Sequence, residues 1–277
     1  MDHPPAPEFD EQDLSAARFE SVNLHGASLR NVDLTGARLR SVDFSGADLR
    51  AVDLHGVRIR GAELLNVRID AELENVVING VDVAPLIEAE LDRRDPRRAL
   101  MRPSDPAGFA DAWHLLERLW DETVERARTF PPEALHDSVD DEWSFIQTLR
   151  HLGFASAAWV GRMVLGNPNP WHPLDLPWDE APGWAGIPCD RDARPALGEV
   201  LEVRRRRQDM VRDVIEGLTP VRLASTLTRA EPGWPQLENF PLKQCLLIVL
   251  NEEWHHRLFA ERDLTALQVM KSPQKES

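Results

Sequence analysis

The chain has 277 residues, and its 47 Asp and Glu outnumber its 32 Lys and Arg, so that the formal net charge is −15. Hydrophobic residues make up 42% of the sequence, which excludes a wholly disordered or collagen-like chain and predicts a globular protein. The acidic balance argues against a nucleic-acid partner, because a protein that binds the phosphate backbone needs a surplus of Lys and Arg. The two cysteines, Cys189 and Cys245, are too few for a disulfide framework or for a zinc site built from cysteines.

The N-terminal segment MDHPPAPEFDEQD is acidic and rich in proline, whereas a secretory signal begins with basic and then apolar residues. The sequence also lacks an apolar run near the ~18 residues that a membrane helix needs. We therefore expect a cytoplasmic protein that has no membrane partner.

A five-residue repeat occupies the first quarter of the chain. A large apolar residue recurs at every fifth position from Leu14 to Ile69, and a small or β-branched residue stands two positions before each of them from Ala17 to Val67. No helix has a period of five, but positions i and i−2 share one face of an extended chain, so each repeat predicts a short strand with two inward side chains followed by a turn. Glycines stand near the predicted turns at Gly26, Gly36, Gly46, Gly56 and Gly61.

This pattern resembles the pentapeptide-repeat family, in which four repeats close one square turn of a right-handed β-helix. The resemblance implies a short right-handed quadrilateral β-helix over residues 10–83, with three turns and a height of about 15 Å at the spacing of paired strands. Some members of the family mimic DNA with an acidic rod, but residues 10–75 carry 12 acidic and 8 basic side chains, which is a weak excess. We expect a scaffold or docking module.

Helical periodicity replaces the repeat in the rest of the chain. Residues 84–104 read as a helical linker, and residues 105–268 as an all-α four-helix bundle, so the chain has two domains. The four helices are predicted at residues 106–129, 142–165, 195–218 and 241–267, each about 36 Å long at 1.5 Å per residue. Between the second and the third lies a segment with seven Pro and three Trp, which predicts a long crossover loop that covers a site. Residues 269–277 are expected to form a disordered tail.

The stretch NEEWHHR on the last predicted helix contains two pairs of metal-ligating side chains one turn apart, Asn251 with His255 and Glu252 with His256. Helical spacing places Glu252 and His256 on the apolar stripe, while His151 on the second helix lies among small residues. A buried carboxylate requires a partner. Two interpretations fit: a divalent metal held by His151, Glu252 and His256, or a hydrogen-bonded core without an ion. Two imidazoles and one carboxylate suit Zn²⁺ with a fourth, open position, or Fe²⁺ or Ni²⁺ with more.

Residues 105–267 resemble the DinB-like superfamily, in particular the branch typified by mycothiol-dependent maleylpyruvate isomerase. The resemblance is carried by WSFIQTLRHL at residues 143–152, WHPLDLPW at 171–178 and NEEWHHRLFAERDL at 251–264. It implies a four-helix bundle and a metal bound by His151, Glu252 and His256. Other branches have a histidine where this chain has Asn251, which leaves Asn251 and His255 as an alternate register.

Members of that family use the metal to activate a low-molecular-weight thiol, such as mycothiol or bacillithiol. The resemblance therefore implies a thiol S-transferase or isomerase that acts on a small electrophile, and Arg162, Trp143 and His172 are further candidates for binding the substrate or the thiol. The alternative is a metal- or ligand-binding interaction protein without turnover. Bundles and short solenoids often pair, which makes a homodimer one expected assembly. The run Arg204 to Arg207 is expected to be a solvated helix face.

Overall fold

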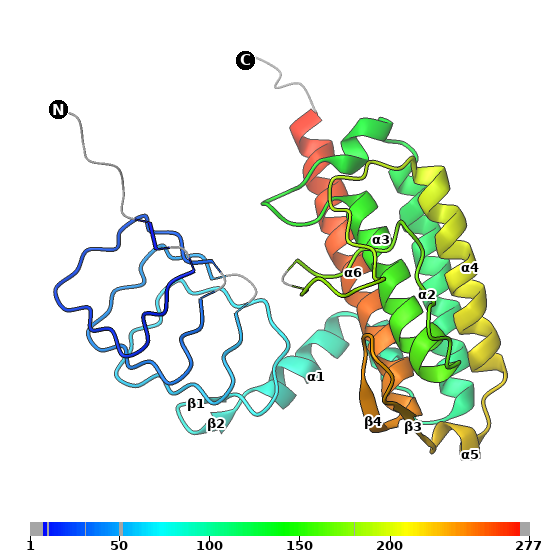
Figure 1. The fold of residues 1–277 in the computed structure, drawn as a ribbon, viewed down its shortest axis with the longest axis horizontal. Coiled ribbons are helices and arrows are strands. Elements are labelled where there is room, and N and C mark those ends of the chain that lie inside the picture. Colours follow the sequence, from blue (N-terminus) through cyan, green and yellow to red (C-terminus); the bar gives the residue numbers. More distant parts are fainter. Residues whose placement is uncertain (1–7, 10, 31, 50–51, 180, 272–277) are drawn as a thin grey trace. The chain divides into compact units, whose positions relative to one another are not determined.

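The computed structural model describes residues 8–271 except residues 10, 31, 50, 51 and 180. Residues 269–271 of the predicted disordered tail are the end of the last helix, and the rest of that tail, from residue 272 onward, lies outside the described residues. The chain divides into two compact units, residues 1–65 and residues 66–277 (Figure 1). Within the described residues, no helix combines the length and the apolar character needed to span a bilayer.

The first unit is a coil that turns at regular intervals. A backbone hydrogen bond closes a turn every ten residues, as between the amide of Ala37 and the carbonyl of Leu34 at 2.9 Å. The third residue of such a turn has a positive φ, +74° at Gly36 and +75° at Gly46, as a type II turn requires. The carboxylate of Asp33 accepts a hydrogen bond of 2.8 Å from the amide of Thr35 and supports the same turn. Gly26, Gly36, Gly46 and Gly56 are therefore turn residues, as predicted, and Gly61, with a φ of +62°, lies at a bend.

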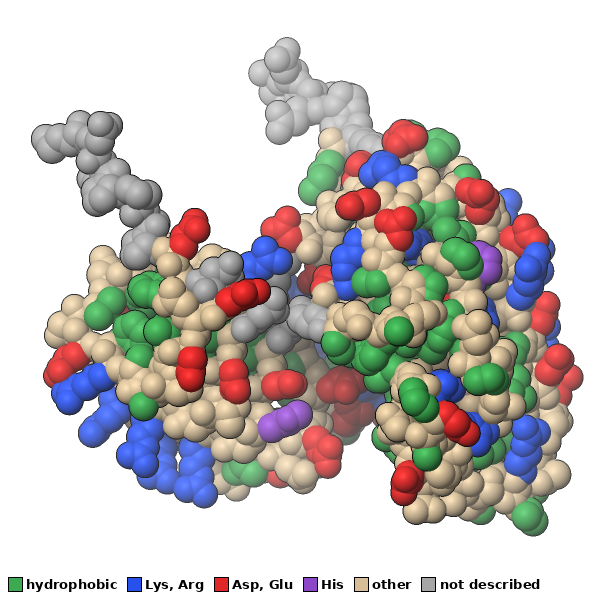
Figure 2. Space-filling view, in the orientation of Figure 1, with side chains coloured by type: hydrophobic (Ala, Val, Ile, Leu, Met, Phe, Trp, Pro, Cys, Tyr) green, Lys and Arg blue, Asp and Glu red, His purple; other side chains and the backbone are tan. Residues whose placement is uncertain are grey.

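The interior of this unit differs from the prediction. No strand is present among the described residues up to Val76, and the large residues of the repeat are exposed, from 43% at Leu14 to 68% at Ile59. The described hydrogen bonds within residues 8–70 join residues two or three positions apart, so these bonds shape each turn without joining one coil to the next. Figure 2 accordingly shows hydrophobic side chains at the surface of the repeats and a row of basic side chains along one edge.

A hairpin and two short helices open the second unit. Strands β1 (Val77–Ile78) and β2 (Val81–Asp82) pair antiparallel around Asn79 and Gly80, whose positive φ angles match a two-residue hairpin turn. Helix α1 (Ala84–Arg94) and the 3₁₀ helix η1 (Pro96–Met101) follow. A second 3₁₀ helix, η2 (Pro132–His136), lies farther along the chain.

Four long helical segments form the body of the second unit in the described part of the chain. They are α2 (Pro106–Ala127), α3 (Phe145–Ser156) with its π-helical continuation η3 (Ala157–Val164), α4 (Leu197–Glu216) and α6 (Leu242–Lys271). The starts of α2 and α3 follow from side-chain caps: Asp105 accepts from the amide of Gly108 at 2.9 Å, and Ser144 forms a capping box with Gln147. Helices α3 and α2 each pack against both α4 and α6 (Figure 1). Buried apolar side chains such as Phe109 and Trp113 fill the space between them.

Besides the hairpin of β1 and β2, this unit departs from the predicted α-helical bundle at two places. The helix predicted at residues 142–165 begins as α helix but adopts π geometry from Ala157 onward. Before α6, the short helix α5 (Pro220–Leu223) leads into an antiparallel hairpin of β3 (Thr226–Arg229) and β4 (Leu237–Pro241), which was not predicted. Side chains of β3 alternate between exposed and half-buried, so the hairpin rests one face on the helices.

Two arginines of the helices hold the crossover loop in place by hydrogen bonds. The Arg150 side chain is 2% exposed and donates to the backbone carbonyls of Leu174 at 2.8 Å and Ala193 at 3.3 Å. Arg207 donates to the carbonyl of Pro170 at 2.7 Å and to the carboxylate of Asp175 at 3.0 Å. These side-chain donors satisfy backbone carbonyls of the crossover loop that have no hydrogen-bond donor among the described residues of the loop.

The prediction of a solvated arginine face was wrong for half of the run. Arg204 is 3% exposed and forms an ion pair of 2.6 Å with buried Glu253, and Arg207 is occupied by the loop. Arg205 and Arg206 are exposed, as expected. The run thus covers both the buried and the solvent side of α4, because consecutive residues of a helix point about 100° apart.

Candidate metal centre

Three side chains from two helices converge at the middle of the second unit. Glu252 and His256 lie one turn apart on α6, and His151 faces them from α3. The Oε2 atom of Glu252 lies 3.0 Å from Nε2 of His256 and 3.4 Å from Nε2 of His151. One ligand atom from each residue can be chosen so that all three lie within 4.8 Å of one another. A single cation can therefore contact all three side chains.

A backbone carbonyl of the crossover loop orients the first of these ligands. Nδ1 of His151 lies 3.0 Å from the carbonyl oxygen of Leu176, and since a carbonyl only accepts, Nδ1 carries the proton. In the neutral ring, Nε2 then presents a lone pair to the Glu252 carboxylate. Two acceptors at 3.4 Å repel unless a cation lies between them, either a proton on the ring or a metal ion. The donor set and its orientation thus fit a divalent metal, and the bond to a carbonyl is the usual outer contact of a metal-binding histidine.

The loop carbonyl is itself held by an ion pair next to it in sequence. Asp175 is 1% exposed, accepts from the amide of His172 at 2.8 Å and pairs with Arg207 at 3.0 Å. Burial raises the pKa of Asp175 in spite of the Arg207 charge. The amide of Leu176 donates to the carbonyl of Arg150 at 3.4 Å. The loop therefore has a defined position from which it contacts His151.

The carboxylate of the site is ionised at neutral pH. Burial raises the pKa of Glu252, but when both rings carry a proton on Nε2 the hydrogen bonds and charges of His151 and His256 outweigh burial and hold that pKa well below its usual range. Glu252 therefore supplies one negative charge to any cation bound at the site.

Trp143 lies against the two histidines. Its ring stacks on that of His256 with centroids 5.7 Å apart and planes at 15°, and it is 4.5 Å from the ring of His151. The indole N–H donates to the carboxylate of Asp179 at 2.9 Å, which ties this ring to the crossover loop. Trp143 therefore covers one side of the site. The sequence indicates it as a candidate for binding the substrate or the thiol.

The structure does not bring the other candidate residues to this site. Arg162 is 2% exposed, its guanidinium donates to the backbone carbonyls of Pro235, Glu231 and Pro232, and it does not line the cavity beside the ligand cluster. The ring nitrogen of His172 accepts from the amide of Leu174.

The alternate register is also directed elsewhere. The Asn251 amide donates to Glu72 at 2.6 Å, and the His255 ring faces that of Phe259 with centroids 6.4 Å apart. Their stripe of α6 lies about 100° around the helix from that of Glu252 and His256.

An aromatic cavity of about 180 Å³ opens beside the ligand cluster, and His151 and Glu252 are among the residues that line it. Its walls are Phe154, Trp159, Trp178, Trp234 and Ile248. Of these, Trp178 belongs to the loop that was expected to cover a site. Trp234 follows strand β3 and was missed, because no local pattern indicates that the segment between the two strands folds back onto α3. Its ring stacks on Phe154 at 5.2 Å, which a spacing argument cannot predict.

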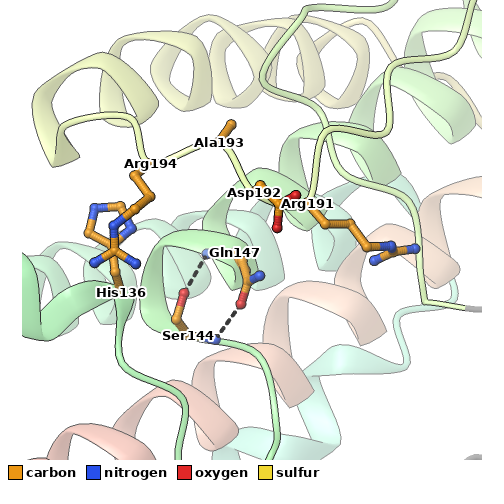
Figure 3. A pocket seen from close by; sticks show the side chains of 7 residues that line it. All are labelled: His136, Ser144, Gln147, Arg191, Asp192, Ala193 and Arg194. Atoms are coloured by element: carbon orange, nitrogen blue, oxygen red, sulfur yellow. Dashed lines mark hydrogen bonds between the residues drawn. The ribbon is translucent and has the colours of Figure 1, made fainter.

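A second cavity, of about 300 Å³, lies between the start of α3 and the end of the crossover loop (Figure 3). His136 and Arg194 line one end of it, and Arg191 extends toward the other. Burial and the Arg194 charge lower the pKa of His136. Arg194 pairs with Glu133 at 3.2 Å, and Arg191 pairs with an aspartate of the loop, so the cations are already neutralised. Metal-ligating side chains do not converge among the described residues of this cavity.

Comparison with known protein families agrees with both resemblances found in the sequence. A family model described as the DinB superfamily matches residues 115–260. A model described as pentapeptide repeats matches residues 17–56 and 27–66, with eight copies of the repeat. No curated protein and no solved structure gave a match.

Proposed function

Because the chain belongs to the DinB superfamily and carries pentapeptide repeats at its N-terminal end, we propose that it is a cytoplasmic, metal-dependent enzyme in which His151, Glu252 and His256 bind a divalent cation. The proposed reaction is the transfer of a low-molecular-weight thiol such as mycothiol to a small electrophile, or an isomerisation that such a thiol assists. The observation that supports it best is the convergence of the two Nε2 atoms on one carboxylate oxygen, at 3.0 and 3.4 Å.

The donor set favours zinc. Two imidazoles and a carboxylate form a three-ligand site with an open position for a substrate, and iron or nickel would fit the same set with more open positions. A divalent cation bound there supplies the positive charge that favours the thiolate form of an incoming thiol near neutral pH.

The residues of the chain have separate tasks in this proposal. The Leu176 carbonyl keeps the proton of His151 on Nδ1 and so directs its lone pair inward. Trp143 and the aromatic cavity walls exclude water, which strengthens the electrostatic interactions within the site. The thiol releases its proton to solvent, and its sulfur forms a bond to the electrophilic carbon while either a π bond at that carbon opens toward the neighbouring atom or a leaving group departs with its electron pair. In a transfer this bond remains; in an isomerisation it breaks again.

One observation supports a second candidate, a metal-binding interaction protein in which the bundle has no turnover. The large residues of the repeat are 43–68% exposed, and exposed apolar surface is typical of docking sites. In both candidates the repeats act as a scaffold or docking module, for a partner or for a second copy of the chain.

The test is a thiol-conjugation assay on the zinc-loaded full chain with mycothiol, bacillithiol and a panel of electrophiles. We expect conjugation or isomerisation by the native chain and its loss in His151→Ala and Glu252→Ala. The matched control is His255→Ala, which changes a neighbouring histidine outside the cluster and should retain activity. Zinc binding without conjugation of any tested pair would favour the interaction protein.

A further inference from the structure

The size of the aromatic cavity limits what can enter beside the ligand cluster. Its volume of about 180 Å³ is smaller than the 300–1,000 Å³ typical of pockets for drug-sized ligands. An apolar cavity of roughly 150 Å³ is known to accept benzene. The cavity therefore has room for one six-membered ring with a small substituent.

The walls are flat and apolar. The rings of Phe154 and Trp234 stack on each other, with centroids 5.2 Å apart and planes at 14°, and Trp178 meets Trp234 edge to face with centroids 5.0 Å apart. Ala155 is 4% exposed and leaves space where a larger side chain would fill the cavity. Aromatic surfaces bind a flat ring by stacking or edge contact, in addition to the gain from burying apolar area.

The charges of the cavity argue against an anionic body. Among the described residues that line it, none is Lys or Arg. Arg162 lies near its Trp234 wall, but its guanidinium is occupied by backbone carbonyls. A carboxylate placed among the aromatic walls, away from the ligand cluster, would have no cationic side chain as a partner, and burying an unpaired charge is costly.

We propose that this cavity binds the neutral, flat, ring-sized body of the electrophile, with the polar reacting group of that molecule directed at His151 and Glu252, which line the cavity. The inference rests on the proposed metal site. A compact cation such as a quaternary ammonium group is the competing occupant, since aromatic walls and one carboxylate attract it. The divalent cation of the proposed function would repel it.

The experiment compares two metal-binding hydroxamates that differ only in the group attached to the hydroxamate carbonyl. Acetohydroxamate bears a methyl group and benzohydroxamate a phenyl ring, and both are titrated by calorimetry into the zinc-loaded full chain. The additional buried area of the ring predicts that benzohydroxamate binds about tenfold or more tightly than acetohydroxamate. Benzyltrimethylammonium serves as the cationic probe and should give no heat of binding.

Two variants test the location. Ala155→Leu fills the cavity and should bring the two hydroxamates to within about twofold, with acetohydroxamate affinity unchanged. Ile248→Ala enlarges the cavity at a half-buried position and should admit a naphthyl hydroxamate that the native chain rejects, which keeps the test available if Ala155→Leu does not fold.

The outcomes separate the two proposals. If acetohydroxamate binds but benzohydroxamate is no tighter, or if the cationic probe binds, the assignment of the cavity is overturned while the metal site stands. If neither hydroxamate binds because the chain holds no zinc, the proposed function falls and this inference with it.

Discussion

The buried ion pair between Arg204 of α4 and Glu253 of α6 provides a quantitative test of how this helical unit is held together. The side chains are 4% and 2% exposed, their atoms approach to 2.6 and 3.2 Å, and the guanidinium carbon lies 4.5 Å from the Trp120 ring centroid. Glu253→Gln leaves a buried cation without its counter-charge and should lower the free energy of unfolding by about 3–5 kcal/mol. The matched control is Glu202→Gln, whose partner Arg206 is 70% exposed, with an expected loss of about 0–1 kcal/mol.

The assay is urea unfolding followed by circular dichroism at the helical band. In the described part of the chain, helices occur in the second unit alone, so this signal reports that unit. A combined Arg204→Met and Glu253→Leu variant should recover most of the loss, because an apolar pair leaves no buried charge. Equal small losses for Glu253→Gln and Glu202→Gln would refute the reasoning, since they would mean that water reaches Arg204.

Two further predictions concern the thiols and the loop beside the cavity. Cys189 is exposed, whereas burial raises the pKa of Cys245 to about 12, so one thiol should react with a thiol reagent at pH 8 and the second only in denaturant. If two thiols react quickly at pH 8, Cys245 is not buried. An unfolded thiol loses its proton near about pH 8.5, while folded Cys245 retains it. The contribution of Cys245 to the free energy of unfolding should therefore be complete below that pH and decline as the pH rises toward 12. Gly233→Ala should lower the free energy of unfolding by about 1–3 kcal/mol, because the φ of Gly233 is +125° and the new Cβ would lie 2.9 Å from the Arg162 side chain. The control, Gly183→Ala, places a Cβ that meets nothing within 4 Å and should have little effect. Equal losses for the two variants in urea unfolding would be evidence against this strain.

The positions of the long helices and of the ligand cluster could be predicted because they depend on local spacing. Asp105 and Ser144 cap helices whose apolar residues recur with helical periodicity. Glu252 and His256 share a stripe of α6 because they are one turn apart. His151 was identified from the small side chains around it, which leave room for a buried ring. The structure brings all three together.

Features that depend on distant contacts could not be predicted. Trp234 reaches the cavity only because the hairpin of β3 and β4 folds back onto α3, and no periodic pattern marks that hairpin. The buried state of Arg204 depends on a glutamate of another helix, so composition alone suggested a solvated face. The exposed side chains of the repeat show the converse case: the period of five predicted the turns, but the packing of one coil on the next depends on contacts outside each repeat.

The central claim, that one divalent cation is held by His151, Glu252 and His256, is tested most directly by measuring zinc per chain after equilibration with zinc and removal of the excess. We predict one zinc per native chain, one per His255→Ala chain, and loss of the zinc in His151→Ala and Glu252→Gln with the helical circular dichroism retained. Full zinc occupancy in both of these variants, or a native chain that binds no divalent metal, would contradict the claim.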